Sequence, residues 1–104
     1  MAFVDNLAKL PAVDHLDRIE LVAADGRTAV IENKPGSAGS VRVYAVLLAR
    51  HGGINAVAAA EGLDCYAEHT EDARLYPGKH PNIDRLIMVC NGGPSWQGRV
   101  VGRT

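Results

Sequence analysis

Two residues in the first third of the chain, Asp25 and Gly26, constrain its fold more than any other feature. They stand between two short apolar stretches, and both tolerate the positive φ of a tight type I′ turn, so the pair predicts a β-hairpin. Residues 16–22 alternate apolar and polar side chains, as a half-buried strand does. We therefore expect residues 28–32 to pair back on that strand.

The rest of the chain has mostly helical patterns. Helices are predicted over 4–10, over 41–50 with Ser40 as the N-cap, over 54–61 up to Gly62, over 63–76, and from Asn82 to residue 90, where a strand over 86–90 is the alternative. Residues 96–101 have the pattern of a last strand that returns to the hairpin. The predicted fold class is α+β, a small antiparallel sheet of hairpin plus C-terminal strand, packed against three to four helices in a single domain over 1–104.

The predicted helix over 41–50 is apolar on most of its surface, and only Arg42 and Arg50 are clearly polar. A helix of this kind has to be covered on most sides. In a chain of 104 residues it either lies at the centre of the fold or gives one face to a second subunit. The second alternative predicts a homodimer.

Charge and composition argue against several classes of function. The chain has 11 Lys and Arg against 12 Asp and Glu, so no overall field attracts nucleic acid or an acidic membrane, and neither is an expected partner. Cys65 and Cys90 lie far apart without C-x-x-C spacing, which favours reduced thiols. The first residues lack the pattern of a secretion signal, and no apolar stretch is long enough to span a bilayer. The predicted location is the cytoplasm.

Residues 34–40 combine glycines, serines and a lysine ahead of a predicted helix. Such a composition can offer backbone N–H groups to an anion. The order G-x-x-x-x-G-K-[ST] of a phosphate-binding loop is missing from this stretch, and so is G-x-G-x-x-G. We therefore interpret it as a connector that ends in a serine cap.

The most concentrated polar chemistry lies between residues 65 and 84. On a helical wheel of residues 63–76, steps of three and four residues place one polar stripe opposite the apolar face. The stripe consists of Cys65, Glu68, His69, Asp72 and Tyr76. Cys, His and Asp at this spacing are competent zinc ligands, and His80 or Asp84 could complete a site if the chain folds back. Established signatures such as H-E-x-x-H are missing, so no metal or cofactor is assigned.

The same stripe has two other interpretations. A Glu, His and Asp face opposite an apolar face is typical of any solvated amphipathic helix. The histidines could instead serve acid–base chemistry, because imidazole titrates near neutral pH and a carboxylate beside it orients the ring. The candidate catalytic residues are His69, His80, Asp84, Glu68 and Asp72.

Four segments of the chain look like a known family. They are 14–21 (DHLDRIEL), 32–36 (ENKPG), 66–74 (YAEHTEDAR) and 77–86 (PGKHPNIDRL). They resemble a small bacterial family catalogued as a domain of unknown function, and the resemblance extends over nearly the whole chain. It implies a bacterial, free-standing cytoplasmic protein, and it brings no activity, cofactor or catalytic residue.

Without a recognisable catalytic motif, the sequence favours a non-catalytic binding or regulatory module. The alternative is a small hydrolase or isomerase-like enzyme, metal-assisted or not, that uses the histidine and carboxylate cluster. The two interpretations differ in one geometric question. It is whether the loop over 77–81 brings His80 and Asp84 to the face of His69.

Overall fold

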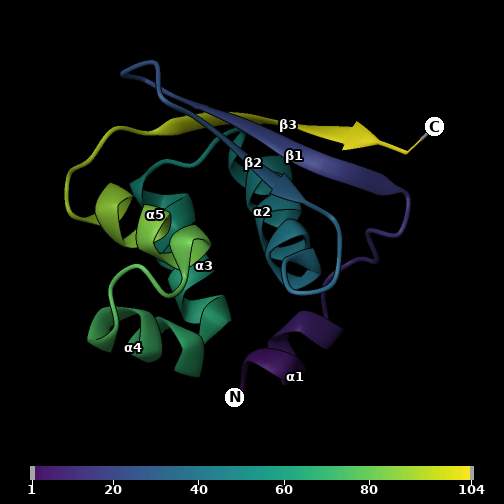
Figure 1. The fold of residues 1–104 in the computed structure, drawn as a ribbon, viewed down its shortest axis with the longest axis horizontal. Helices are drawn as coiled ribbons and strands as arrows, with labels where there is room; N and C mark the ends of the chain where they lie inside the picture. The colour runs from purple at the N-terminus through teal and green to yellow at the C-terminus, as the bar shows by residue number, and fades with distance from the viewer. Residues whose placement is uncertain (1, 104) are drawn as a thin grey trace.

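The computed structural model describes residues 2–103 and has an α+β fold, as predicted. A three-stranded antiparallel sheet lies above five helices, which are all on the same side of it (Figure 1). The elements are α1 (Phe3–Ala8), β1 (Leu16–Ala23), β2 (Thr28–Glu32), α2 (Ala38–His51), α3 (Ala56–Tyr66), α4 (Glu68–Leu75), α5 (Pro81–Cys90) and β3 (Trp96–Gly102). No helix within residues 2–103 has the length and apolar character needed to cross a membrane.

The predicted hairpin is confirmed, but its turn differs from the predicted type. The N–H of Ala23 donates to the carbonyl of Arg27 at 2.7 Å, so three residues rather than two form the loop. The N–H of Gly26 donates back to the carbonyl of Ala23, and Gly26 has a φ of 93°. This is a type I turn followed by one left-handed residue, in which only the glycine needs a positive φ.

Strand β1 is the centre of the sheet, between β2 and β3. The C-terminal strand returns to the hairpin as predicted, and it pairs antiparallel with β1. Ile19 and Leu21 are buried under the helices, whereas Glu20 lies on the other face and forms an ion pair with Arg99 at 2.8 Å. The alternation of β1 therefore follows the prediction, with one face in the core and one face open.

Helix α2 lies at the centre of the fold, which confirms the first of the two alternatives for the apolar helix. It contacts all three strands as well as α1 and α3, and Val41, Val43, Tyr44 and Leu47 are buried. Its cover comes from within the chain, so its apolar surface does not require a second subunit. The predicted Ser40 cap is wrong because α2 begins at Ala38, which places Ser40 inside the first turn.

The predicted helix over 63–76 is two helices. Helix α3 continues through Gly62 to Tyr66, and the chain then bends at Ala67, where φ is 52° and ψ is −116°. The hydroxyl of Thr70, a buried side chain, donates to the carbonyl of Leu63 at 2.6 Å across the bend. The bend thus satisfies a carbonyl at the end of α3, and α4 starts in a new direction.

Helix α5 settles the choice between helix and strand over 86–90 in favour of helix. It begins at Pro81 with His80 at the N-cap position, so the predicted Asn82 cap is wrong. Proline suits the first helical position because its missing N–H would have no intrahelical partner there. Ile83 and Leu86 are buried against the core.

Candidate functional site

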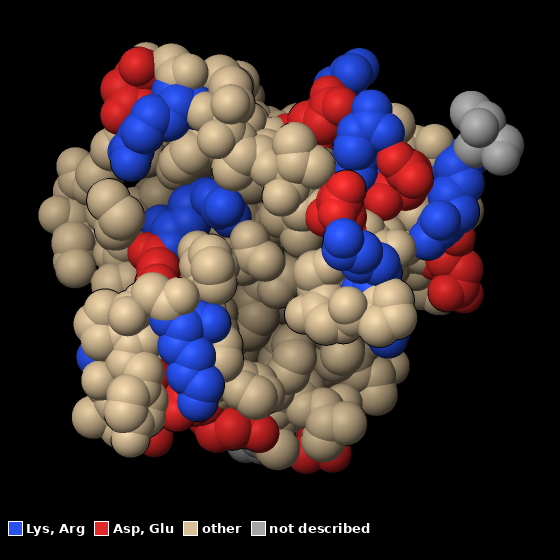
Figure 2. All heavy atoms as spheres, viewed as in Figure 1, with Lys and Arg blue, Asp and Glu red and all other residues tan. Residues whose placement is uncertain are grey.

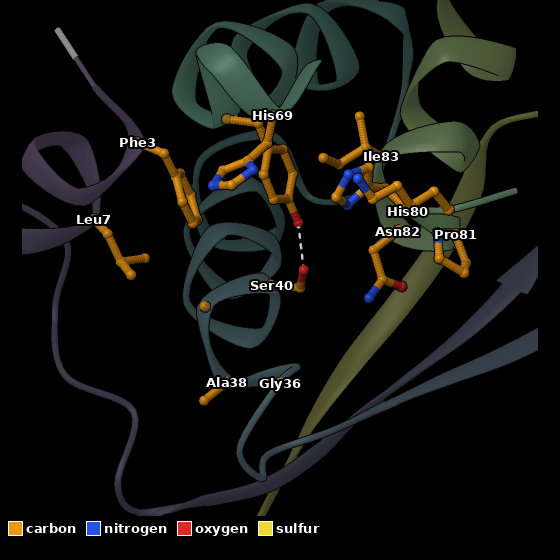
Figure 3. A pocket seen from close by; sticks show the side chains of 13 residues that line it. Phe3, Leu7, Gly36, Ala38, Ser40, His69, His80, Pro81, Asn82 and Ile83 are labelled. Carbon is orange, nitrogen blue, oxygen red and sulfur yellow. Dashed lines mark hydrogen bonds between the residues drawn. The ribbon is translucent and has the colours of Figure 1, made fainter. Parts of the chain in front are cut away.

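A pocket of about 470 Å³, called here the histidine pocket, lies where α1, α4 and the beginnings of α2 and α5 meet. Figure 3 shows its walls, with Phe3 and Leu7 on one side and His80 with Asn82 on the other. The lining comes from four regions of the chain that are distant in sequence. It includes Phe3, Leu7, Ser40, Tyr66, His69, Lys79, His80, Asn82 and Ile83.

The two predicted histidines, His69 and His80, come together in this pocket. Their ring centroids are 5.9 Å apart, and the edge of His69 also meets Phe3 at 5.1 Å. A tight turn between α4 and α5 makes this possible, because Gly78 has a φ of 93° and its N–H donates to Asp84 Oδ2 at 2.9 Å. The loop over 77–81 therefore does bring His80 back to the face of His69.

Asp72, which does not line the pocket, orients the imidazole ring of His80. His80 Nε2 lies 2.6 Å from Asp72 Oδ2, and Lys79 Nζ lies 2.9 Å from the same oxygen. These two partners, His80 first, hold the pKa of the Asp72 carboxyl below its usual range. An ionised carboxylate only accepts hydrogen bonds, so Nε2 carries the proton and Nδ1 of a neutral His80 is an acceptor. Such an imidazole can accept a proton or a hydrogen bond from a bound molecule.

The other two predicted carboxylates hold the backbone rather than line the pocket. Glu68 Oε1 accepts the N–H of Phe3 at 2.7 Å, and this bond lowers the pKa of the Glu68 carboxyl. Asp84 accepts the N–H of Gly78 and so fixes the turn that carries His80. Of the five candidates, His69 and His80 line the pocket, Asp72 acts through His80, and Glu68 and Asp84 support its walls.

Besides Lys79, three polar residues of the pocket were not among the predicted candidates. Tyr66 donates its hydroxyl proton to Ser40 Oγ at 2.7 Å, which leaves the proton of Ser40 free for another acceptor. Asn82 Oδ1 accepts from Arg85, which leaves the amide NH₂ of Asn82 available. The only sequence signal for this wall is the glycine and serine stretch over 34–40, because Ser40 meets Tyr66 only in the folded chain.

The beginning of α2 adds backbone donors to the same wall. The N–H groups of Gly39 and Ser40 donate to no acceptor within residues 2–103, and both residues line the pocket. Burial raises the pKa of the Tyr66 hydroxyl, so it stays protonated and keeps its bond to Ser40. This side of the pocket is therefore rich in hydrogen-bond donors.

The zinc grouping considered from the sequence does not assemble. The bend at Ala67 separates Cys65 from the stripe on α4, and burial raises the pKa of the Cys65 thiol. In the part of the chain that the structure describes, no three His, Cys, Asp or Glu side chains lie close enough together to hold a metal ion.

Comparisons with known proteins bear on the family alone. No curated protein and no solved structure matches the chain. A family model matches residues 3–100, which is nearly the whole chain, and its description is "Uncharacterized protein conserved in bacteria (DUF2322)". The chain therefore belongs to this family of uncharacterised bacterial proteins, as the resemblance of its motifs implied.

Proposed function

We propose that the chain is a non-catalytic binding module, and that the histidine pocket takes a small, planar molecule rich in hydrogen-bond acceptors. The observation that carries the proposal is the set of donors around the pocket without a matching acceptor. These donors are the hydroxyl of Ser40, the amide NH₂ of Asn82 and the N–H groups of Gly39 and Ser40. None of the lining residues, all within residues 2–103, is Asp or Glu.

The aromatic groups of the pocket support the planar shape of the ligand. Phe3 stacks on Tyr66 at 5.2 Å, and His69 meets Phe3 edge-on at 5.1 Å. Such a row of rings favours a flat partner, because aromatic groups prefer offset-stacked or edge-to-face contacts. His69 has no hydrogen bond to a residue of the described chain, so both of its ring nitrogens are available to the ligand.

Protein-observed NMR with a library of heteroaromatic fragments that bear carbonyl or carboxylate groups tests this proposal. We expect fragments that shift the ring signals of His69 and His80, and about tenfold weaker binding to the His69→Ala variant. His15→Ala is the matched control, because His15 is exposed and lies at the start of β1. Equal binding to the His69→Ala variant, or no fragment in this pocket, would overturn the proposal.

The enzyme alternative has the pair of Asp72 and His80 as its candidate chemistry, and the comparisons add nothing in its favour. The same NMR samples test it. Turnover of a fragment over hours, abolished by His80→Ala and kept by His15→Ala, would favour the alternative over a binding module. We expect the fragments to bind without reacting.

A homodimer also belongs to the proposal, although α2 no longer supplies the reason for it. The support comes from the open face of the sheet, where Val22 and Val30 are 45% and 55% exposed. Light scattering over a range of concentrations tests it, with Val30→Lys as the variant that should weaken association. A clean monomer at the highest concentration would remove this part of the proposal.

The cytoplasm is the location that we propose for the module. Its support is that Cys65 and Cys90 are both free thiols, as reducing compartments maintain them. Fractionation of bacteria that express the tagged full chain tests the location. Recovery of the chain outside the cytoplasmic fraction would contradict it.

A further inference from the structure

A second cleft, of about 460 Å³, lies between the hairpin and α5 on the other side of Pro81 from the histidine pocket. Its walls are formed by Thr28, Ala29, Met88, Pro94 and Trp96. Figure 2 shows basic side-chain atoms set back in a hollow of the surface below the hairpin tip. A cation at the bottom of a hollow is unusual, since Arg and Lys mostly extend into solvent.

Arg85 is one of the two arginines that line this cleft, and it is half-buried. One nitrogen, Nη1, donates to Tyr44 Oη at 3.1 Å and to Asn82 Oδ1 at 3.0 Å. No carboxylate within residues 2–103 forms an ion pair with Arg85. Burial raises the pKa of Tyr44 to about 12, so its hydroxyl is neutral and does not compensate the charge.

The guanidinium of Arg85 is held in place by two aromatic rings and by two hydrogen bonds at one nitrogen. Its carbon lies 5.6 Å from the ring centroid of Tyr44 and 5.3 Å from that of Trp96. The two contacts and the two bonds at Nη1 fix the plane of the group, and they leave the Nε and Nη2 edge without a partner in the described chain. That edge presents two parallel N–H donors, which match the two oxygens of a carboxylate.

A second arginine, Arg27, also lines the cleft, and the carboxylates of Asp25 and Asp84 reduce the positive charge there. The guanidinium carbon of Arg27 lies 5.7 Å from the ring centroid of Trp96, and its Nε is paired with Asp25. Asp84 also lines the cleft, but one of its oxygens accepts the N–H of Gly78. Since Asp25 pairs with Arg27, the guanidinium of the lining that has no ion-pair partner within residues 2–103 is that of Arg85, and it lies beside an apolar wall.

We infer that this cleft, called here the Arg85 cleft, binds the carboxylate of a small molecule that has an apolar body. The carboxylate lies against the Nε and Nη2 edge of Arg85, and the body lies against Trp96 and Met88. The ligand must be small, since the cleft has a volume of about 460 Å³. The Arg85 cleft shares only Pro81 with the lining of the histidine pocket, and the inference does not depend on the function proposed for that pocket.

Benzoate is a suitable probe, with benzamide as its neutral counterpart of the same shape. Trp96 is the single tryptophan of the chain, so one indole N–H signal in the NMR spectrum reports on the cleft. We expect millimolar benzoate to shift this signal in a saturable way and benzamide to shift it much less. Equal shifts from both compounds, or none from benzoate, would overturn the inference. Saturable binding of inorganic phosphate without benzoate would overturn the assignment to a carboxylate.

Substitutions test whether Arg85 is the residue that binds the carboxylate of benzoate. Arg85→Lys keeps the charge but loses the paired donors, so benzoate should bind about tenfold or more weakly. Arg27→Gln leaves the contacts of Arg85 unchanged and should weaken binding less, through charge alone. Arg74→Gln is the control because Arg74 is exposed on α4. If Arg85→Lys destabilises the chain in thermal unfolding, the affinity of the Arg27→Gln variant for benzoate decides whether the site is accepted. Wild-type affinity in both variants would refute the site.

Discussion

Asp72 and His80 form the shortest contact between two side chains beside the histidine pocket, with 2.6 Å between Oδ2 and Nε2, and the titration of Asp72 reports on it. Replacing His80 by Ala removes the first cause of the lowered pKa, so the pKa of the Asp72 carboxyl should rise towards its usual value. The rise should be partial because Lys79 remains beside the carboxylate. NMR titration of the side-chain carboxyl carbon measures it, and an unchanged pKa would contradict the pairing.

The sign of the associated stability change follows from the direction of the shift. A carboxyl whose pKa is lowered by folding stabilises the folded chain above its unfolded pKa, and this contribution is lost as the pH falls through the folded pKa. His80→Ala should therefore reduce stability at neutral pH and have little effect in strong acid. The His15→Ala variant, which removes an exposed imidazole elsewhere, should keep the wild-type profile.

The bend between α3 and α4 places a non-glycine residue, Ala67, in a backbone region that favours glycine, with φ 52° and ψ −116°. These angles belong to the first central position of a type II′ turn, where a Cβ is strained. Ala67→Gly should therefore raise the free energy of unfolding by about 1 kcal/mol, because relief of strain outweighs the added entropy of the unfolded chain. Urea denaturation measures the change.

Ala60→Gly is the matched control for that substitution. Ala60 is exposed in the middle of α3, where the backbone is helical and unstrained. The same change of side chain should here lower the free energy of unfolding by about 1 kcal/mol. Opposite signs for the two variants are the expected result, and a loss of stability in both would show that Ala67 is not strained.

Gly62 is a point where α3 packs closely against its neighbours. A Cβ built on it would lie 2.7 Å from Leu86 Cδ1 and 2.9 Å from Leu47 Cδ1, and both leucines are fully buried. Helix propensity alone predicts that Gly62→Ala stabilises the helix by about 1 kcal/mol. We expect the opposite, a loss of about 1–3 kcal/mol, because both leucines are buried and an added methyl group would displace their ends into a packed core. Thermal unfolding decides the sign, and a gain in stability would show that the leucines adjust.

At the scale of the whole molecule, local patterns predicted the sheet better than the helix boundaries. The hairpin follows from Asp25 and Gly26, and the burial of β1 follows from its alternation. The bend at Ala67 could not be predicted, because alanine is the best helix former and the bend depends on the bond between Thr70 and Leu63. Gly62 gave a false stop signal, since packing against other helices holds it inside α3.

The candidate site, too, could be predicted from the sequence only in part. A helical wheel found the polar stripe, but it could not separate pocket residues from supporting ones. His80 reaches His69 because of a turn fixed by Asp84, a contact between residues six apart in sequence. Ser40 and Tyr66 come from separate helices and meet only through the packing of α2 on α3. Such long-range contacts leave no periodic signal in one sequence.

Helix α1 closes the histidine pocket from the N-terminal side, and its attachment to α4 depends on Glu68. The carboxylate accepts the N–H of Phe3, while Asn6 donates to the carbonyl of Cys65 at 3.1 Å and Phe3 stacks on Tyr66. Glu68→Ala removes the charged contact and leaves the other two. We therefore expect several-fold faster hydrogen exchange in α1 and no change in β1.

Glu71→Ala provides the comparison, because Glu71 is exposed in the same first turn of α4 and gives the same favourable charge to the helix N-terminus. Its removal should leave exchange in α1 unchanged. Since the bond to Phe3 lowers the pKa of Glu68, α1 of the wild-type chain should also loosen as the pH falls through that value. Equal exchange in the two variants would mean that stacking and the Asn6 bond suffice, and that the pocket wall does not depend on the Glu68 charge.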